Sequence, residues 1–332
     1  MATEERVDAV LIAGDLFDAP RPANKTVIAV RETVRRLVEL EIPVLAVPGN
    51  HDAHALNPDL YTTALDGAVT FLEHRFAEPV RVECDAGDLF VYGIAYDAAE
   101  EPDPLATFRH AQGEGLHVVI LHGSVPGAPH WNQGSSLSLP LDALARLDVD
   151  YLALGDLHRF RTSDELGGIP ACYPGSFAAV DLTEMGLRGP VVVEARPGEP
   201  PDIRRLSSGL REVAAPIAVD VSACATDLDV VDKVARHARV DAIPSVVLRG
   251  EPVYPLDPEA VRANLEERFG AATVRDESHF FDLLRLEELA RSNTVAGHVA
   301  RLGLETIAGA SDEERRSLEQ GLRIALRVLE IG

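Results

Sequence analysis

Side chains that can bind metal ions follow four apolar runs in the first half of this chain. The runs and their polar residues are "LIAGD" (Asp15), "VLAVPGNHD" (Asn50, His51, Asp52), "VVILHG" (His122) and "LALGDLH" (Asp156, His158). Each signal is weak alone, because a Gly-Asp after a strand is often only a turn and a lone histidine is more often structural. Since the carboxyl ends of parallel strands meet in one crevice, four such strand ends together predict a shared metal site.

The ligand types indicate which metal chemistry this site supports. Carboxylate, amide oxygen and imidazole, with no thiolate, suit Mn²⁺ or Mg²⁺ and also permit Fe²⁺ or Zn²⁺. Two such ions about 3.5 to 4 Å apart can hold a phosphate and activate a bridging water. Asp15 is our candidate for the carboxylate that bridges them. His51 is placed to bind the phosphate or to protonate the departing alkoxide, and the alternative for it is a structural histidine on a tight loop.

The elements that position these residues alternate along the chain. Short apolar runs occur at residues 7–13, 43–47, 89–94, 117–121 and 151–154. Residues 22–40 have apolar side chains at helical spacing behind a first-turn proline. Strands that alternate with helices predict a largely parallel sheet covered on both faces. Runs at 177–182 and 190–195 predict a second sheet that completes the same domain.

A smaller unit follows a turn-rich segment at residues 195–202. The pattern predicts strands at 216–221, 243–249 and 272–275 and helices at 227–237 and 258–269, and beyond about residue 284 the chain is helical. The last helix has an apolar stripe that includes Leu318, Leu322, Ala325 and Leu329. Packing of this stripe against the protein itself is favoured over packing against another chain.

Composition narrows the class of protein. A chain of 332 residues with 46% hydrophobic and 26% charged residues predicts about two globular domains. No apolar run approaches the roughly 18 residues of a membrane helix, and the N-terminus lacks a secretory pattern, so we expect a cytoplasmic protein without a membrane partner. The net charge of -23 disfavours broad attraction to DNA but does not exclude a local site. Cys84, Cys172 and Cys224 predict buried thiols rather than a disulfide framework.

The motifs "GDLFD", "GNHD", "LHG" and "GDLH", in this order, resemble those of calcineurin-like metallophosphoesterases. "YLALGDLHR" followed by "YPGSF", and the small unit after residue 212, are more narrowly similar to double-strand-break repair nucleases of the SbcD and YhaO type. The resemblance implies an α/β fold: a four-layer sandwich of two sheets flanked by helices, a small α/β capping domain and C-terminal helices. The corresponding boundaries are 1–208, 212–284 and 285–332.

The same resemblance implies a two-metal site with Mn²⁺ as the first choice. Asp15 would bridge the ions, one ion would be completed by Asn50, His122 and Asp156, and His158 would belong to the other ion. His51 would be the catalytic histidine. The implied activity is Mn²⁺-dependent exonuclease and endonuclease cleavage of DNA by a homodimer whose C-terminal helices dock an SbcC-like coiled-coil ATPase.

Two departures from the family pattern matter. Histidine is more frequent in the family at the position of Asp156. An aspartate oxygen there can still bind a metal ion, and it makes the site more anionic. No Asp-x-His precedes Asp15, so the second ion retains only Asp15 and His158. A strand, helix and strand need about 30 residues, and "MATEERV" is shorter. Three explanations for the missing motif follow in order of preference. The first is a truncated or wrongly started chain, and the second is a protein that binds one metal ion and has little or no activity. The third is a substitute ligand such as His54.

Further residues near the motifs have two interpretations each. Arg159 and Arg161 either hold DNA phosphates or pair with Asp164 or Glu165, and Ser176 either binds phosphate or shapes a turn. Trp131 and His130 either line a substrate groove or fix a long loop. Three functions therefore stay open: the nuclease component of a repair complex, a phosphodiesterase or phosphatase for a small substrate, and a non-catalytic scaffold.

Overall fold

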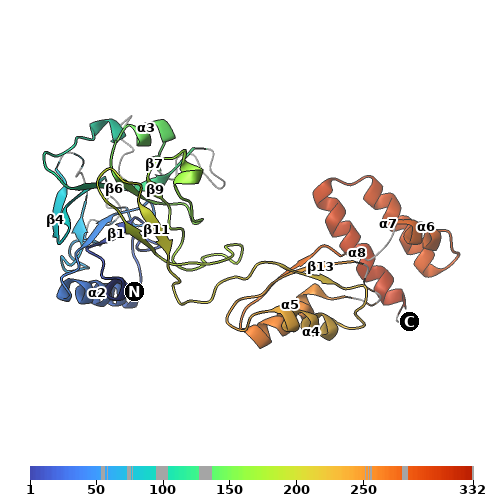
Figure 1. Cartoon of the computed structure of the whole chain (residues 1–332). Coiled ribbons are helices and arrows are strands. Elements are labelled where there is room, and N and C mark those ends of the chain that lie inside the picture. The colour runs from blue at the N-terminus through green and yellow to red at the C-terminus, as the bar shows by residue number, and fades with distance from the viewer. Residues whose placement is uncertain are drawn as a thin grey trace. The chain divides into compact units, whose positions relative to one another are not determined.

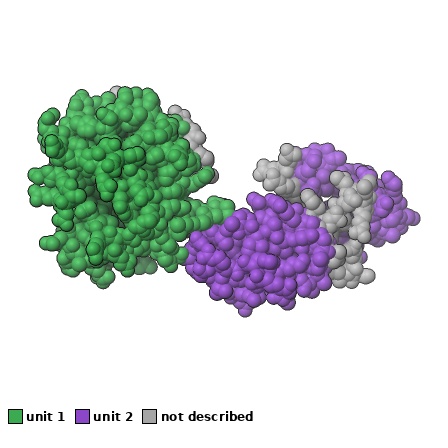
Figure 2. Space-filling view, viewed as in Figure 1, with its two compact units in different colours: residues 1–210 green, residues 211–332 purple. Residues whose placement is uncertain are grey.

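The computed structural model describes residues 1–53, 57, 59–72, 76, 78–94, 104–126, 137–250, 252, 254, 256–278 and 283–330. The predictions for His54, His130 and Trp131 lie outside these residues. The chain forms two compact units, Met1–Leu210 and Arg211–Gly332, which Figure 2 colours separately.

The first unit begins with a small parallel sheet. Strands β1 (Val10–Ala13), β2 (Val44–Val47) and β3 (Thr70–Phe71) are hydrogen-bonded in that order. Helix α2 (Asn24–Glu39) connects β1 to β2, as the helical spacing predicted. Among the described strands, β1 pairs only with β2. Its register, from Val10 opposite Val44 to Ala13 opposite Val47, brings the ends of both strands to the same edge.

A larger sheet contains the remaining motif strands. Its order is β4 (Val80–Cys84), β5 (Gly87–Gly93), β6 (Leu116–Ser124), β8 (Tyr151–Gly155) and β9 (Ala171–Cys172), and β7 (Leu137–Ser138) pairs with β6. The β4–β5 pair is antiparallel and the other pairs are parallel. The prediction that all the motif strands share one parallel sheet is therefore wrong. The β4–β5 hairpin starts a new sheet after β3, which leaves β1 and β2 in a separate layer.

The two sheets pack face to face. Because side chains alternate across a strand, Leu45 and Val47 of β2 point into an inner core with Val91 and Ile120 of the larger sheet. The alternate residues of β2 pack with the apolar face of α2. Helix α3 (Leu141–Ala145) and neighbouring loops cover the outer face of the larger sheet. Figure 1 shows α2 and α3 on opposite sides of this unit. The predicted α/β fold with several sheets flanked by helices is confirmed.

The region after β9 differs from its prediction. Residues 177–182 form bends and turns instead of a strand, and Phe177, Val180 and Leu182 are exposed. The Asp181 carboxylate accepts a hydrogen bond from the backbone N–H of Thr183, 2.7 Å away, which closes a turn that a strand cannot contain. Strands β10 (Val191–Glu194) and β11 (Asp202–Arg205) form an antiparallel hairpin, so the second predicted run is a strand.

The second unit begins with a three-stranded parallel sheet of β12 (Ile217–Asp220), β13 (Ser245–Arg249) and β14 (Thr273–Asp276). Helices α4 (Asp227–His237) and α5 (Pro258–Phe269) share a buried core with it. Thr226 begins α4 with a capping box, and Asp257 begins α5 ahead of a first-turn proline. These elements match the strands and helices that the sequence pattern predicted.

Three helices follow: α6 (Leu283–Ala290), α7 (Val295–Ala308) and α8 (Asp312–Glu330). Leu322 and Leu326 of α8 are buried in one cluster with Leu286 and Ala300, so part of the predicted apolar stripe packs inside this unit. A separate boundary at residue 285 stays a prediction. No helix in the described residues is long and apolar enough to cross a membrane. Short helical turns complete the chain: α1 (Ala2–Glu5), η3 (Pro104–Thr107) and η4 (Ser163–Leu166).

The three cysteines are free thiols. Cys172 and Cys224 are buried as predicted, whereas Cys84 is only partly buried because β4 is the edge strand of its sheet. Burial raises the pKa of the Cys172 thiol to about 12, so this thiol is protonated at neutral pH and is a packing residue.

Candidate metal centre

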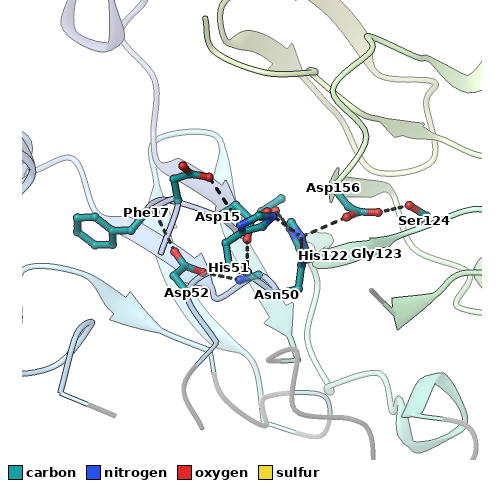
Figure 3. A network of polar contacts seen from close by, with 12 residues as sticks. Asp15, Phe17, Asn50, His51, Asp52, His122, Gly123, Ser124 and Asp156 are labelled. Carbon is teal, nitrogen blue, oxygen red and sulfur yellow. Dashed lines mark hydrogen bonds and ion pairs between the residues drawn. The ribbon is translucent and has the colours of Figure 1, made fainter. Parts of the chain in front are cut away.

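The ends of β1, β2, β6 and β8 meet around the ring of His122. The side chain of His122 is 1% exposed, and its Nδ1 lies 2.8 Å from the carbonyl oxygen of Ala13. Its Nε2 lies 2.9 Å from Asn50 Oδ1, 3.4 Å from Asp15 Oδ2 and 3.6 Å from Asp156 Oδ1. Figure 3 shows these four side chains directed toward one another. The structure thus brings together one residue from each of the four motifs.

The chemistry of this group indicates a cation. Because Nδ1 of His122 donates its proton to a carbonyl oxygen, the neutral ring carries a lone pair on Nε2. The three atoms around Nε2 are oxygens that also present lone pairs. Such an arrangement is stable only when a proton or a metal ion lies among them. Four lone-pair donors directed at one point are the usual environment of a divalent metal ion.

The distances also fit a metal ion. Ligand atoms that lie about 2.1 Å from one ion are about 3.0 Å apart in octahedral and about 3.4 Å apart in tetrahedral geometry. The contacts of Nε2 with Asn50 and Asp15, at 2.9 and 3.4 Å, fall at these values. Among the described residues, no set of three or more His, Cys, Asp or Glu side chains forms a metal cage by itself. The amide oxygen of Asn50 is the nearest of the three oxygens to Nε2 of His122.

The two central groups stabilise each other's charge. Burial disfavours ionisation of Asp15, but the hydrogen bond and charge of His122 outweigh it and lower the pKa of Asp15. Burial likewise disfavours the His122 cation, but contact with Asp15 outweighs it and raises the pKa of His122. Contact between the two groups thus favours the charged form of each, and a divalent metal ion would compete with a proton for Nε2 of His122.

The backbone is strained where the carboxylates leave their strands. Asp15 has φ 51° and Asp156 has φ 103°, in the left-handed region that residues with a Cβ rarely adopt. Gly14 has φ 85°, and a Cβ there would lie 2.0 Å from His122 Nδ1. A Cβ at Gly49 would lie 2.1 Å from Asp15 Oδ1. These tight turns place the acidic side chains against the ring, and strain of this kind is concentrated at functional sites.

Asp52 fixes the backbone segments that carry the site residues, a role that the sequence did not reveal. Its side chain is fully buried and accepts hydrogen bonds from the backbone N–H groups of Gly49 at 2.8 Å and Phe17 at 3.0 Å. It also accepts from the Tyr61 hydroxyl at 2.6 Å. Burial raises the pKa of Asp52 although these donors favour the carboxylate. Asp52 therefore joins the "GNHD" loop to the segment that follows Asp15, and only its place in that motif signals its importance.

His51 lies beside this group without entering it. Its backbone N–H donates to Asp15 Oδ1 at 3.0 Å, and its ring Nδ1 lies 3.6 Å from Asp18 Oδ1. The ring is 50% exposed. An imidazole at the edge of a metal site, open to solvent, can contact a bound phosphate ester and exchange a proton with it.

His158 is separate from the group around His122. Its Nδ1 lies 2.6 Å from Glu184 Oε1, and its side chain is 56% exposed. In the described part of the chain, His158 has no hydrogen bond or ion pair with Asp15, Asn50, His122 or Asp156. Glu184 was not predicted as part of the site, because nothing in its local sequence distinguishes it from a surface glutamate.

Of the remaining candidates, Arg159 and Ser176 have side-chain partners in the protein, and Arg161 has a backbone partner. Arg159 is 74% exposed and lies 3.7 Å from Glu165, one of the two partners that its alternative interpretation named. The backbone of Arg161 forms a bridge with Tyr173. The Ser176 hydroxyl donates to Glu184 Oε2 at 2.6 Å. Roles for these residues in substrate binding stay predictions.

Comparison with known proteins gives one family match and several related proteins. Residues 1–160 match the family model of the calcineurin-like phosphoesterases. The uncharacterized metallophosphoesterase YhaO of Bacillus subtilis is 28% identical over 211 residues, 60% of this chain and 48% of that protein. The DNA double-strand break repair protein Mre11 of Aeropyrum pernix is 30% identical over 219 residues, 62% of this chain and 52% of that protein.

A third relative is the SbcD component of the nuclease SbcCD from Bacillus subtilis, which is 25% identical over 233 residues, 59% of this chain and 58% of that protein. The chain therefore spans about half the length of the curated relatives that it matches.

Proposed function

We propose that this chain, whose residues 1–160 match the family model of the calcineurin-like phosphoesterases, is a metal-dependent phosphodiester hydrolase that cleaves DNA. The observation that supports this proposal most directly is the set of three oxygens around Nε2 of His122, in a donor geometry suited to a divalent ion. Mn²⁺ is the metal we propose, because the donors are mainly oxygen with one imidazole.

The residues at the four strand ends would hold the metal. Asn50, His122 and Asp156 would bind one ion together with Asp15, whose Oδ2 faces that ring. Asp15 and His158 would bind the second ion. Two such metal ions would polarise a bound phosphate and activate a water molecule. Low exposure of His122 and Asp156, 1% and 17%, keeps bulk water from competing for their lone pairs.

His51 is proposed as the general acid. Its Nδ1 faces Asp18, so Nε2 is the nitrogen left to give a proton to the departing oxygen of the ester. The Asp15 carboxylate accepts the His51 backbone N–H, which ties the position of the acid to that of a metal ligand. A proton delivered at the leaving oxygen is worth about 10²- to 10⁴-fold in rate when the leaving group is a poor one.

DNA is preferred over a small ester as the substrate because two of the relatives are a DNA double-strand break repair protein and a component of a nuclease. We further propose a homodimer that docks an SbcC-like coiled-coil ATPase through the C-terminal helices. Supporting this, α8 leaves Ile324 and Val328 54% and 67% exposed while Leu322 and Leu326 of the same helix are buried.

A cleavage assay tests the proposal. Linear duplex and hairpin DNA are incubated with the full chain and Mn²⁺, with and without the ATPase, beside bis(p-nitrophenyl) phosphate. We expect DNA cleavage that EDTA abolishes and that His122→Asn removes, whereas His237→Asn, a matched change on α4 of the second unit, has no effect. Hydrolysis of the chromogenic diester but never of DNA would instead indicate a small-substrate enzyme. Absence of both activities, with metal bound, would indicate a scaffold.

A further inference from the structure

Glu184 is a mostly buried carboxylate whose two oxygens have different partners. Its side chain is 11% exposed. Oε1 lies 2.6 Å from His158 Nδ1, while Oε2 accepts hydrogen bonds from the Ser176 hydroxyl at 2.6 Å and the Val180 backbone N–H at 3.2 Å. Both oxygens are therefore held by donors. The carboxylate has one orientation, and in that orientation it faces a histidine that the sequence assigns to the metal site.

The segment around Glu184 also fixes the backbone of His158. The His158 carbonyl oxygen accepts hydrogen bonds from the Ser176 backbone N–H at 3.1 Å and from Arg188 Nη1. Arg188, 10% exposed, also donates to the Ser176 hydroxyl at 2.9 Å and lies 3.6 Å from Glu184 Oε2. Gly175 has φ 80°, and a Cβ there would lie 2.7 Å from the same carbonyl oxygen. His158 is thus held by its main chain and by Nδ1.

The chemical consequence concerns the other ring nitrogen. A histidine that donates Nδ1–H to a carboxylate keeps its lone pair on Nε2, and metal-binding histidines are oriented in this way. In the described residues, His158 Nε2 makes no hydrogen bond or ion pair, and the side chain is 56% exposed. Only the nitrogen suited to a metal is left open.

We propose that Glu184 is a positioning residue for the metal site: it fixes His158 as the Nδ1–H tautomer and directs Nε2 toward the second divalent ion. The inference rests on the proposed function for the presence of that ion. It adds a residue 26 positions away in the chain, two positions after the run 177–182 whose strand prediction was wrong. The tight turns of this segment are what direct the Glu184 side chain inward while Phe177 and Val180 stay exposed.

The first test reads the tautomer directly and needs neither metal nor activity. Long-range ¹H–¹⁵N spectra of the full chain with ¹⁵N-labelled histidine, at a pH where the ring is neutral, identify His158 by comparison with His158→Gln. We expect wild-type His158 to be the Nδ1–H form. Glu184→Ala should shift it toward the Nε2–H form that predominates in free imidazole side chains. Glu184→Gln keeps a carbonyl acceptor and should restore the Nδ1–H form. A wild-type His158 in the Nε2–H form overturns the proposal even if no variant folds.

The second test measures metal affinity by calorimetric titration of the full chain with Mn²⁺. Loss of an oriented partner of a metal-binding histidine typically weakens binding about 10- to 100-fold. We expect Glu184→Ala to weaken by this factor a binding event that His158→Ala weakens even more, and Glu184→Ala to cause no additional loss when His158→Ala is already present. Glu83→Ala, which removes an 81% exposed carboxylate from β4, is the control for net charge.

The outcomes separate this proposal from the proposed function. Additive losses in the double variant, or wild-type affinity in Glu184→Ala, overturn the role of Glu184, and so does wild-type protein in which no Mn²⁺ binding depends on His158. If the tautomer and the coupled metal binding are as expected but no DNA is cleaved, the positioning role stands and the nuclease assignment falls.

Discussion

Both units contain parallel strands, and the carboxyl ends of these strands differ in how their polar groups are satisfied. In the first unit, oxygens of Asp15, Asn50 and Asp156 surround Nε2 of His122. In the neutral ring the proton is on Nδ1, so Nε2 has none to donate to them. In the second unit, β12 ends at Asp220, whose carboxylate accepts the Ser222 backbone N–H at 2.9 Å.

The rest of the second edge is paired in the same local way. Lys233 Nζ donates to the Asp220 carbonyl oxygen at 2.9 Å. Arg249, the last residue of β13, lies with Nε 3.1 Å from Glu277 Oε2 just beyond β14. The two edges have a related backbone topology, but among the residues compared only those of the first edge gather three oxygens around one ring nitrogen. We therefore expect metal binding at a parallel sheet edge to depend on which side chains gather there, because topology alone does not produce a site.

The largest expected effect is that of removing the central ring of the first edge. His122→Asn takes away the nitrogen shared by all the oxygens, so we expect Mn²⁺ binding at this centre to be lost. Hydrolysis should fall at least on the order of 10³-fold, since metal stabilisation of charge is worth several kcal/mol and each 1.36 kcal/mol is tenfold in rate. Calorimetry and DNA cleavage measure these changes, with His237→Asn as control. If His122→Asn bound Mn²⁺ with wild-type affinity, the proposal that the first edge binds metal through His122 would be wrong.

The next largest effect separates metal binding from catalysis at the same edge. His51→Ala should leave Mn²⁺ affinity within about twofold and lower DNA cleavage by at least about 10²-fold, because a general acid is lost. The loss should be much smaller for bis(p-nitrophenyl) phosphate, whose leaving group departs without a proton. An equal loss on both substrates would make His51 a phosphate-binding residue, and a loss of metal would make it a ligand.

A third effect concerns Asp52, the buried carboxylate that fixes the backbone of the first edge. The residues of the second edge compared above include no buried carboxylate of this kind. Asp52→Asn keeps the size of the side chain but replaces one acceptor oxygen by a donor, so a donor must face a donor. We expect the free energy of unfolding to fall by about 2–3 kcal/mol, and by about 1 kcal/mol in Tyr61→Phe, which removes one donor. Chemical denaturation measures this, and hydrogen exchange of peptides from the first unit separates it from the second.

Unchanged stability in Asp52→Asn would mean that the three hydrogen bonds to its carboxylate do not hold the "GNHD" loop, and that the metal ligands alone determine the loop conformation.

The sequence predicted most of what depends on the local chain. Strands such as β6 and β8 were found because a run of apolar residues must be buried on both faces of a parallel sheet. Asp15, Asn50, His122 and Asp156 were brought together by the general rule that such strands end in one crevice, and the structure places them around one nitrogen.

Features that depend on contacts between distant segments were not predictable in this way. The division of the motif strands between two sheets follows from the β4–β5 hairpin, whose antiparallel pairing leaves no signal at β1 or β2. The apolar residues of 177–182 suggested a strand, but turn-forming hydrogen bonds at Asp181 and Glu184 outweigh their preference for one. Glu184 itself is defined by an interaction with His158, and only the fold shows that interaction.

The smallest expected effect is at the second edge. Arg249 is 61% and Glu277 38% exposed, and an ion pair this accessible to water contributes only about 0–1 kcal/mol. Arg249→Ala should therefore change the free energy of unfolding by no more than about 0.5 kcal/mol and leave Mn²⁺ binding and hydrolysis unchanged. A double-mutant cycle with Glu277→Ala, measured at low and high salt, gives the pair energy. If Arg249→Ala instead created a new Mn²⁺ site, with Glu277 and Asp220 as its ligands, the contrast would become sharper: local pairing would then be all that keeps the second edge from binding metal.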